Sequence, residues 1–156
     1  HSLVANSFMY PLRYKDTEVV NLQPEQHQVN LRVKVIAQIM FGEVDDGEST
    51  LSKIKVAEFL VGDSSGCIIV KAINEQISLL QPQTCVLIHD ARVEMYRGFM
   101  RILVDQNTNA EIKPFGEAGD DKVAHANGKG DDIQPNLEKN RSLTEYQYVP
   151  HVVLNE

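Results

Sequence analysis

Hydrophobic and polar residues alternate from residue 29 to residue 35, and this period of two predicts a β-strand with one buried face. The polar positions Arg32 and Lys34 would point to solvent. We expect the strand to end near Met40, and an acidic, glycine-containing loop to occupy residues 41–52. The buried face would consist of the four apolar residues of the alternation: Val29, Leu31, Val33 and Val35.

Four more runs rich in β-branched and aromatic residues predict four more strands. A tight turn follows the first of them, and we expect Gly66 to adopt a positive φ there. The dipeptide Arg97-Gly98 predicts a second hairpin turn. Between the two turns, Asn74 is a candidate N-cap for a short helix over residues 75–80. The four predicted strands cover residues 53–62, 67–73, 84–95 and 99–105.

Alternation within these runs separates a predicted core from a predicted outer face. The core would contain Phe59, Val61, Ile68, Val70, Val86, Ile88, Met100 and Ile102. The outward residues of the third and fifth strands would be Cys67, Ile69, Lys71, Ile73, Phe99, Arg101 and Leu103.

Five strands with one helix between the third and the fourth is the order of elements in an OB-fold barrel. We therefore predict an all-β protein: a five-stranded OB-fold Greek-key barrel with a short helix between strands 3 and 4, and with extensions at both ends. The predicted parts are an N-terminal arm (1–18), the OB-fold domain (19–115), a flexible acidic, Gly-rich excursion (116–139) and a C-terminal segment that docks on the barrel (140–156).

The composition fits a single domain without a membrane segment. The chain has 156 residues, 42% of them apolar, and no apolar run approaches the roughly 18 residues of a membrane span. Cys67 and Cys85 have no partner at metal-ligand spacing, which favours buried free thiols in an intracellular protein, in the nucleus or the cytoplasm. An organelle stays open, because the first residue is His1 rather than Met. We expect no cofactor, no metal site and no enzymatic activity.

The net charge of −7 is unusual for a protein that binds nucleic acid, because neutralisation of phosphates supplies most non-specific affinity. Residues 28–113 contain 9 Lys and Arg against 11 Asp and Glu, so most of the negative charge lies in the extensions. The charge therefore neither establishes nor excludes a nucleic-acid ligand.

Four basic residues converge on one side of the predicted barrel, with Tyr96 at the adjoining turn. OB-folds bind single strands through a cationic groove combined with aromatic stacking, so this side is our candidate interface. Arg32, Lys34 and Lys55 would extend the path. An ordinary solvated basic surface is the alternative interpretation. The four converging residues are Lys71, Arg92, Arg97 and Arg101.

The apolar residues on the outer face favour a second hypothesis. An exposed apolar patch marks a protein partner, or a covering segment of the same chain such as the arm at residues 1–15. In that case the protein would be an interaction module within a larger assembly, without nucleic-acid binding. The residues of this patch are Ile69, Ile73, Phe99 and Leu103.

Residues 60–105 read LVGDSSGCIIVKAINEQISLLQPQTCVLIHDARVEMYRGFMRILVD. This stretch resembles the small single OB-fold proteins of the SOSS type, which bind single-stranded DNA. It resembles still more closely a plant and protist group of uncharacterised single-OB proteins, in which a Met-aromatic-basic-Gly-x-Met-Arg run recurs. Here that run extends from Met95 to Arg101. The resemblance implies binding of single-stranded DNA or RNA.

The chain departs from the SOSS type at the stacking positions. Those proteins stack bases on several aromatic side chains, and among the matching positions of this chain only Tyr96 is aromatic. Ile73 stands in place of a Trp, and Arg92 and Leu103 stand in place of Tyr. Stacking contributes about 1–3 kcal/mol per base, so we expect weak, salt-sensitive binding with low sequence specificity.

Overall fold

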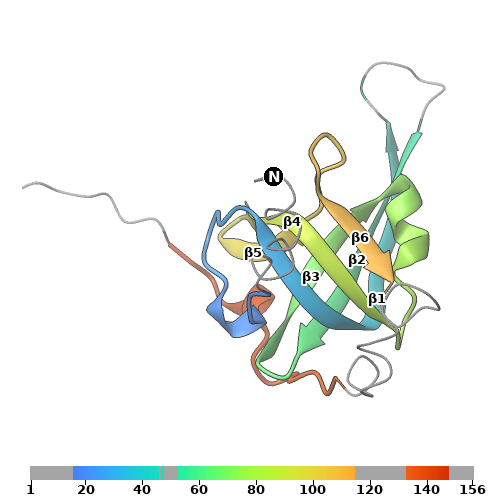
Figure 1. Cartoon of the computed structure of the whole chain (residues 1–156). Coiled ribbons are helices and arrows are strands. Elements are labelled where there is room, and N and C mark those ends of the chain that lie inside the picture. Colours follow the sequence, from blue (N-terminus) through green and yellow to red (C-terminus); the bar gives the residue numbers. More distant parts are fainter. Residues whose placement is uncertain (1–15, 46, 48–52, 115–132, 148–156) are drawn as a thin grey trace, which may run out of the picture.

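The computed structural model describes residues 16–45, 47, 53–114 and 133–147 (Figure 1). None of the helices in these ranges is long and apolar enough to cross a membrane. In chain order the elements are η1 (Val19–Asn21), β1 (Val29–Asp45), β2 (Lys53–Asp63), β3 (Gly66–Ile73), η2 (Asn74–Leu79), β4 (Cys85–Tyr96), β5 (Phe99–Leu103), β6 (Glu111–Pro114) and η3 (Arg141–Leu143); the elements labelled η are 3-10 helices.

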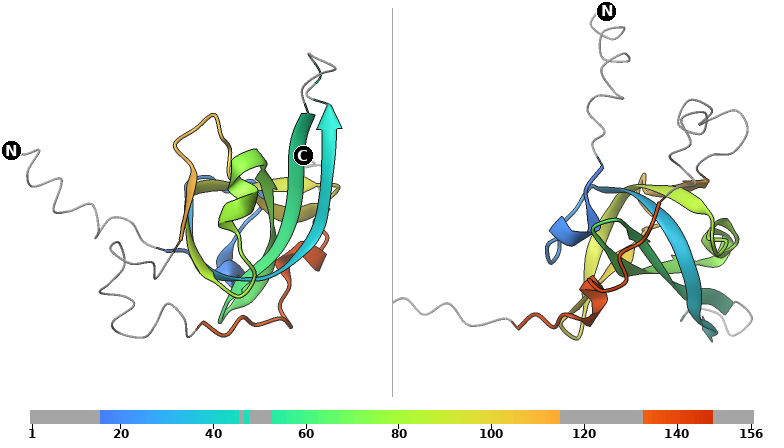
Figure 2. Two further views of the ribbon diagram at one scale, coloured as in Figure 1. Left: turned by 90° about the vertical axis from the view of Figure 1, so that its right-hand side faces the viewer. Right: turned by 90° about the horizontal axis from the view of Figure 1, so that it is seen from below.

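The strands form one sheet in the order β1-β2-β3-β5-β4-β6, and β1 also pairs with β4. The sheet thus curves back on itself into a barrel, as the two views of Figure 2 show. This arrangement confirms the predicted OB-fold. The edge strand β6, which pairs with β4, was not predicted. It has four residues and ends at Pro114, so it is too short for an alternation and contains a residue typical of sheet edges.

The core agrees with the predicted alternation. All eight residues predicted to lie inside the barrel are at most 1% exposed, and so are the four apolar residues of the β1 alternation. Burial of apolar side chains stabilises a fold by about 25 cal/mol for each Å² removed from water. These twelve positions therefore fix which face of each strand points outward.

The first strand is longer than predicted. The prediction of a loop is wrong for residues 41–45, which continue β1 as one half of a hairpin with β2. Glu43 lies opposite Lys55 and Asp45 opposite Lys53, and the Lys53 ammonium lies 3.1 Å from the Asp45 carboxylate. Opposite charges facing one another across two strands favour their pairing. The hairpin projects beyond the barrel (Figure 2).

The helix between β3 and β4 begins differently from the prediction. Ile73, not Asn74, occupies the N-cap position of η2, and Asn74 adopts a φ of 54°. The side chain of Asn74 instead accepts a hydrogen bond from the Lys55 amide at 3.0 Å. Gln76 anchors the helix, because its side chain accepts from the Ile73 amide and donates to the Val104 carbonyl, both at 2.9 Å.

The seam between β3 and β5 is closed in two ways: by direct pairing of the two strands, and by a C-terminal segment, residues 139–146. The parallel pairing of these strands includes only Val70 with Ile102 and Lys71 with Leu103. Beyond this point the strands separate, and residues 139–146 lie along the opening. Unpaired backbone groups in such an opening would be costly, so the segment is part of the barrel.

Ser142 is the central contact of this C-terminal segment. Its buried hydroxyl accepts a hydrogen bond from the Ile69 amide of β3 at 2.9 Å and donates one to the Met100 carbonyl of β5 at 2.6 Å. On either side, the Cys67 amide donates to the Lys139 carbonyl and the Tyr146 amide donates to the Gly98 carbonyl. Tyr146 packs against the core. Tyr148 and the residues after it, also expected to dock, lie outside the described residues.

The C-terminal segment explains two wrong predictions on β3. Cys67 was expected to point to solvent, but it is fully buried, with its sulfur 4.0 Å from the Leu137 carbonyl. Burial raises the pKa of the Cys67 thiol. Gly66 was expected to adopt a positive φ and does not. A side chain at Gly66 would instead meet the Lys139 carbonyl, since an added Cβ would lie 2.7 Å from that oxygen. Cys67 and Cys85 are both buried free thiols, as predicted.

Hydrogen bonds connect the N-terminal part of the described chain to the β2–β3 turn and to the C-terminal segment. The Asp63 carboxylate accepts hydrogen bonds from Ser65 and Gly66 within the turn and from the Val19 amide of η1 at 3.1 Å. Arg141 donates to the Leu22 carbonyl at 2.7 Å and to the Tyr146 hydroxyl at 2.8 Å. Residues 1–15, predicted to form an arm, lie outside the described residues.

Candidate nucleic-acid interface

A row of cross-strand neighbours runs over the outer face of the barrel. Glu58 on β2 lies opposite Lys71 on β3, Lys71 lies beside Leu103 on β5, and Leu103 lies opposite Arg92 on β4. Residues opposite one another in a sheet share a face. Neighbouring strands lie about 4.8 Å apart, so the Cα atoms of Lys71 and Arg92 are separated by roughly 10 Å. The fold thus brings these two predicted site residues onto one surface, called here the outer face of β2, β3, β5 and β4.

Tyr96 lies at the end of β4 on the same surface, 48% exposed. The following turn has Arg97 at a φ of 53° and Gly98 at a φ of 90°, the two left-handed residues that a two-residue hairpin turn requires. The guanidinium carbon of Arg101 lies 4.4 Å from the centre of the Tyr96 ring, and that of Arg97 lies 5.3 Å from it. Both cations are within the range of attraction to an aromatic ring, so they hold Tyr96 in place.

Arg101 is engaged by an acidic partner. Its guanidinium forms an ion pair with Glu58 at 2.5 Å, and both side chains are only 16% exposed. From the sequence, Arg101 was predicted to hold the nucleic-acid backbone. In the structure Glu58 compensates its charge, and its guanidinium lies against the Tyr96 ring.

Lys71 and Arg92 are different from Arg101. Within the part of the chain that the structure describes, neither side chain forms an ion pair or a hydrogen bond with another residue. Their positive charges are therefore available to a phosphate group. The carboxylate of Glu58, which lies opposite Lys71, is engaged by Arg101. Arg97, exposed at the hairpin turn, forms no ion pair in the described ranges either.

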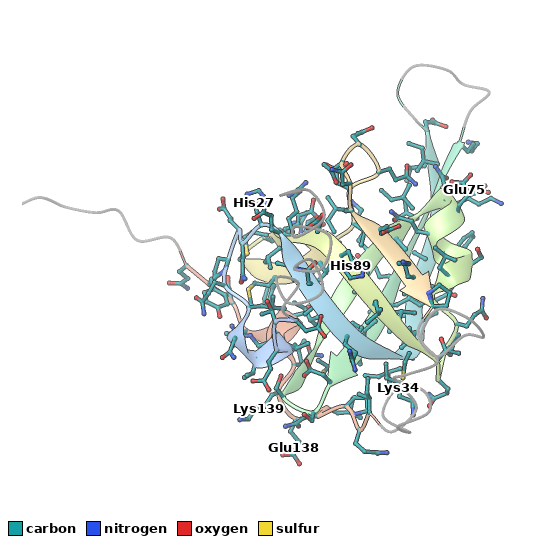
Figure 3. The ribbon with its side chains drawn as sticks, viewed as in Figure 1. His27, Lys34, Glu75, His89, Glu138 and Lys139 are labelled. Atoms are coloured by element: carbon teal, nitrogen blue, oxygen red, sulfur yellow. The ribbon has the colours of Figure 1, made fainter. Side chains whose placement is uncertain are left out.

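The three remaining predicted site residues lie elsewhere. Arg32 and Lys34 are on β1, where their neighbours are residues of β4, and Arg32 lies 3.4 Å from the Asp16 carboxylate. Figure 3 shows Lys34 far from His27, which precedes β1. Lys55 lines a cleft against η2 together with Glu75. The structure therefore does not join these residues to Lys71 and Arg92.

The predicted apolar patch is smaller than expected. Leu103 is only 8% exposed, so its assignment to an exposed partner surface is wrong. It is covered because it occupies the middle of the row, between the neighbouring strands that carry Lys71 and Arg92. Ile69, Ile73 and Phe99 are half-buried.

The larger exposed apolar surface was not predicted from the sequence. It belongs to the β1–β2 hairpin, where Met40 is 39% and Val44 50% exposed. Met40 lies opposite Glu58 and Val44 opposite Ile54, so these residues continue the outer face. The spacing of residues did not reveal it, because two register shifts, between Val35 and Ala37 and between Gln38 and Met40, interrupt the period of two.

Comparison with protein families shows to which family the chain belongs. Residues 22–112 match the family described as single-stranded DNA binding protein Ssb-like, OB fold. The chain belongs to this family. The matched range extends from the end of η1 into β6 and contains every strand of the candidate interface.

This member of the Ssb-like family is similar to plant proteins both in sequence and in structure. Over 52 residues it is 38% identical to an uncharacterised protein of Arabidopsis thaliana; this stretch is 33% of the chain and 34% of that protein. The solution structure of a hypothetical protein from Arabidopsis thaliana has a TM-score of 0.62 and 27% identity, covering 90% of this chain and 93% of that one. These similarities agree with the resemblance to uncharacterised plant proteins.

The fold also occurs in a larger assembly. A replication protein A heterotrimer bound to single-stranded DNA contains a similar structure, with a TM-score of 0.53 and 18% identity, covering 77% of this chain and 26% of that one. At this level of identity the similarity establishes the shared OB-fold. This chain is therefore an OB-fold domain related to single-stranded DNA-binding proteins.

Proposed function

We propose that this protein binds single-stranded DNA or RNA with low sequence specificity, as a binding protein rather than an enzyme. The observation that carries the proposal is the outer face of β2, β3, β5 and β4. There Lys71 and Arg92, which form no ion pair with any described residue, accompany the half-exposed ring of Tyr96. Membership of the Ssb-like family supports it. A closer kinship with the SOSS type, and an intracellular location, are parts of the same proposal.

Each residue has a distinct task in this mechanism. Lys71 and Arg92 attract backbone phosphates, and Tyr96 stacks on a base. Arg101 lies against the Tyr96 ring and is fixed by Glu58, so it holds the ring in a ready position without adding net charge to the surface. Such preorganisation lowers the entropy lost when the ligand binds.

The salt dependence of binding measures how many cations take part. Each phosphate contact to a single strand contributes about −0.7 to the slope of log K against log salt concentration. Lys71, Arg92 and Arg97 together predict a slope of about −2, whereas the additional participation of Arg101 would bring it near −3. A slope of about −2 is our expectation, because Glu58 compensates Arg101.

Fluorescence anisotropy with labelled oligothymidine and oligouridine at low salt tests the proposal. Arg92→Ala should weaken binding and flatten the salt slope by about 0.7. Lys113→Ala is the matched control, because Lys113 is an exposed cation on β6, outside the outer face of β2, β3, β5 and β4, and its removal should leave the slope unchanged. If neither oligonucleotide binds at low salt, the proposed function is wrong.

The stacking step is tested separately with Tyr96. Tyr96→Ala should lower the affinity by about 1–3 kcal/mol without changing the slope, because stacking releases no counterions. Tyr96→Phe keeps the ring and should retain the affinity. Equal affinities of the Ala and Phe variants would exclude Tyr96 as a stacking platform.

A second candidate function is supported by the β1–β2 hairpin. Met40 and Val44 are exposed, and apolar side chains grouped on a surface are typical of protein interfaces. The protein would then be an OB-fold module recruited into a larger assembly. Val44→Gln removes an apolar side chain without adding charge, so it should abolish assembly with the protein partners while leaving oligonucleotide affinity unchanged; unaltered assembly would eliminate this candidate.

A further inference from the structure

A polar cleft adjoins the proposed interface at Arg92. The cleft has a volume of about 240 Å³ and lies between β4, the residues just before β1 and the residues that connect β5 to β6. Its walls include Gln28, Asp90, Asp105 and Asn109, so it combines carboxylate and amide groups with one guanidinium. A strand bound along Lys71 and Arg92 passes the mouth of this cleft.

The backbone is distorted on two sides of the cleft. Asn30 of β1 faces two residues of β4, His89 and Asp90, which is a β-bulge. Asp90 has a φ of 55°, and its amide donates a hydrogen bond to the Asn30 side chain at 3.0 Å. Gln28, which directly precedes β1, also has a φ of 55°. Bulges redirect side chains near binding sites, and left-handed residues other than glycine are costly, so two of them around one cleft indicate a function.

The polar groups of the cleft have hydrogen-bonding capacity to spare. Asp105 accepts one hydrogen bond, from the Asn107 amide at 2.9 Å, through one of its two carboxylate oxygens. Within the described ranges, the Asp90 carboxylate accepts none, and Arg92 forms no ion pair with either carboxylate. The cleft thus presents strong acceptors and a planar cationic donor that are not already used on one another.

The carboxylates and the guanidinium of the cleft favour some classes of ligand over others. Two carboxylates would repel a phosphate group, and no group of three potential metal ligands occurs in the described part of the chain. A nucleobase carries donors and acceptors around its ring, which matches a cleft with a guanidinium and two carboxylates. Guanine has two adjacent acceptors, O6 and N7, that suit an arginine, and on another edge an amino group that donates to a carboxylate. Adenine lacks the second acceptor, thymine and uracil lack the amino group, and cytosine presents only an amino donor on its major-groove edge.

We infer that the cleft formed by Gln28, Asp90, Arg92, Asp105 and Asn109 takes up one guanine base of the bound single strand. On a strand without guanine Arg92 contacts a backbone phosphate; where a guanine enters the cleft, the guanidinium donates instead to the acceptors O6 and N7 of the base, and the Asp90 and Asp105 carboxylates accept from its amino group. This inference rests on the proposed function and adds a preferred base at one position of an otherwise unspecific interface. Unstacked bases of single strands are commonly recognised through their edges in this way.

The first experiment compares the binding of two labelled strands at low salt: oligothymidine, and the same strand with one central guanine. The guanine-containing strand should bind at least about fivefold more tightly. Asp90→Asn should remove this preference, so that both strands bind equally; the ratio of the two affinities is the readout, because loss of one negative charge affects both strands alike. Asparagine tolerates the left-handed conformation, so the variant keeps the bulge. Glu111→Gln, a change of an exposed carboxylate on β6, is the control and should retain the preference.

The second experiment uses guanosine monophosphate and thymidine monophosphate as probes, with backbone amide signals read by NMR. Guanosine monophosphate should shift the signals of Asp90 and Asn109, and thymidine monophosphate should not. Equal binding of both strands, together with equal shifts by both nucleotides, would overturn the inference while leaving the proposed function intact. Shifts specific to guanosine monophosphate in a protein that binds no oligonucleotide would support the cleft and reject the proposed function.

Discussion

The seam between β3 and β5 is built differently in its two halves. In one half, Val70 and Lys71 pair directly with the neighbouring strand, and the outer surface carries Lys71 and Arg92, two cations without an ion pair among the described residues. In the other half the strands separate, and Ser142 bridges them through its hydroxyl. Here the side chain of Cys67 is fully buried, beneath the C-terminal segment.

The difference between the two halves shows which part of the barrel surface must be covered by another segment of the chain. Buried backbone amides and carbonyls must be satisfied, so a place where two strands separate needs another segment of chain to complete it. In this protein the C-terminal segment fulfils that need and occupies the surface in doing so. The backbone of the directly paired half needs no such cover, and its outer face is the surface that we propose for nucleic-acid binding.

The largest effect is expected from Val70→Asp, in the directly paired half. A buried, unpaired carboxylate costs several kcal/mol against a total stability of about 5–15 kcal/mol, so the domain should unfold. Lys71→Asp, one residue further along, should remain folded because its side chain is outside the core, but should lose oligonucleotide affinity. Circular dichroism and thermal melting of the two variants measure the contrast. A cooperatively folded Val70→Asp protein would mean that the register of β3 is wrong.

Truncation after Gln134 should have the next largest effect, on the other half of the seam. It removes Ser142, both hydrogen bonds of Arg141 and the packing of Tyr146. Together these losses should lower the free energy of unfolding by about 3–5 kcal/mol. Chemical denaturation measures the change.

The matched control replaces residues 116–131 with a short Gly-Ser linker. A short linker suffices, because Pro114 lies opposite Val86 on β4 and Gln134 borders a cleft with Lys34 on the adjoining strand β1. The replaced residues are too polar and glycine-rich to offset the entropy lost on ordering them, so stability should change little. Equal losses in truncation and control would mean that docking of the C-terminal segment does not stabilise the barrel.

Ser142→Ala isolates the bridge itself. The variant leaves the buried Ile69 amide and Met100 carbonyl without their partner, which should cost about 1–3 kcal/mol. Leu143→Ala is the control: Leu143 is 74% exposed, and the change should stay within about 0.5 kcal/mol. Thermal melts of the two variants that coincide would contradict a structural role for the bridge.

Glu58→Gln tests whether the charge of Arg101, on the directly paired half of the seam, takes part in binding. Removing the carboxylate frees the charge of Arg101, so affinity for oligothymidine should rise about three- to tenfold and the salt slope should steepen by about 0.7. Asp45→Asn removes a carboxylate whose ion pair lies on the β1–β2 hairpin and should change neither quantity. Weaker binding by Glu58→Gln would show that fixing Arg101 against Tyr96 matters more than its charge.

The smallest effect concerns the reactivity of Cys67. It reports on opening of the half of the seam in which the C-terminal segment covers the separated strands. In a Cys85→Ala background only Cys67 reacts with a thiol reagent. Burial raises the pKa of this thiol, so less thiolate is present at a given pH, and the reaction should be slow and gain speed only at higher pH. Ser142→Ala should accelerate it by loosening the cover. An unchanged rate would mean that the segment opens independently of the bridge.

The sequence predicted the elements whose signals are local. Alternation identified the core residues of β1 to β5, and Gly98 was correctly expected in a hairpin turn, where it has a positive φ. The same alternation placed Lys71 and Arg92 outside the core. It failed for Cys67 and Leu103, because a period of two shows which side of a strand a residue occupies but not what covers that side.

By itself, the sequence determined the OB-fold and the inward face of each strand, because these follow from the burial of apolar residues at fixed spacing. Only the tertiary structure decided which charges are available. Glu58 and Arg101 are 43 residues apart and meet across β3, and Asp90 and Asp105 join Arg92 around one cleft through a bulge and a loop. Such contacts depend on strand register and on backbone distortion, which the spacing of residues along a single chain does not encode.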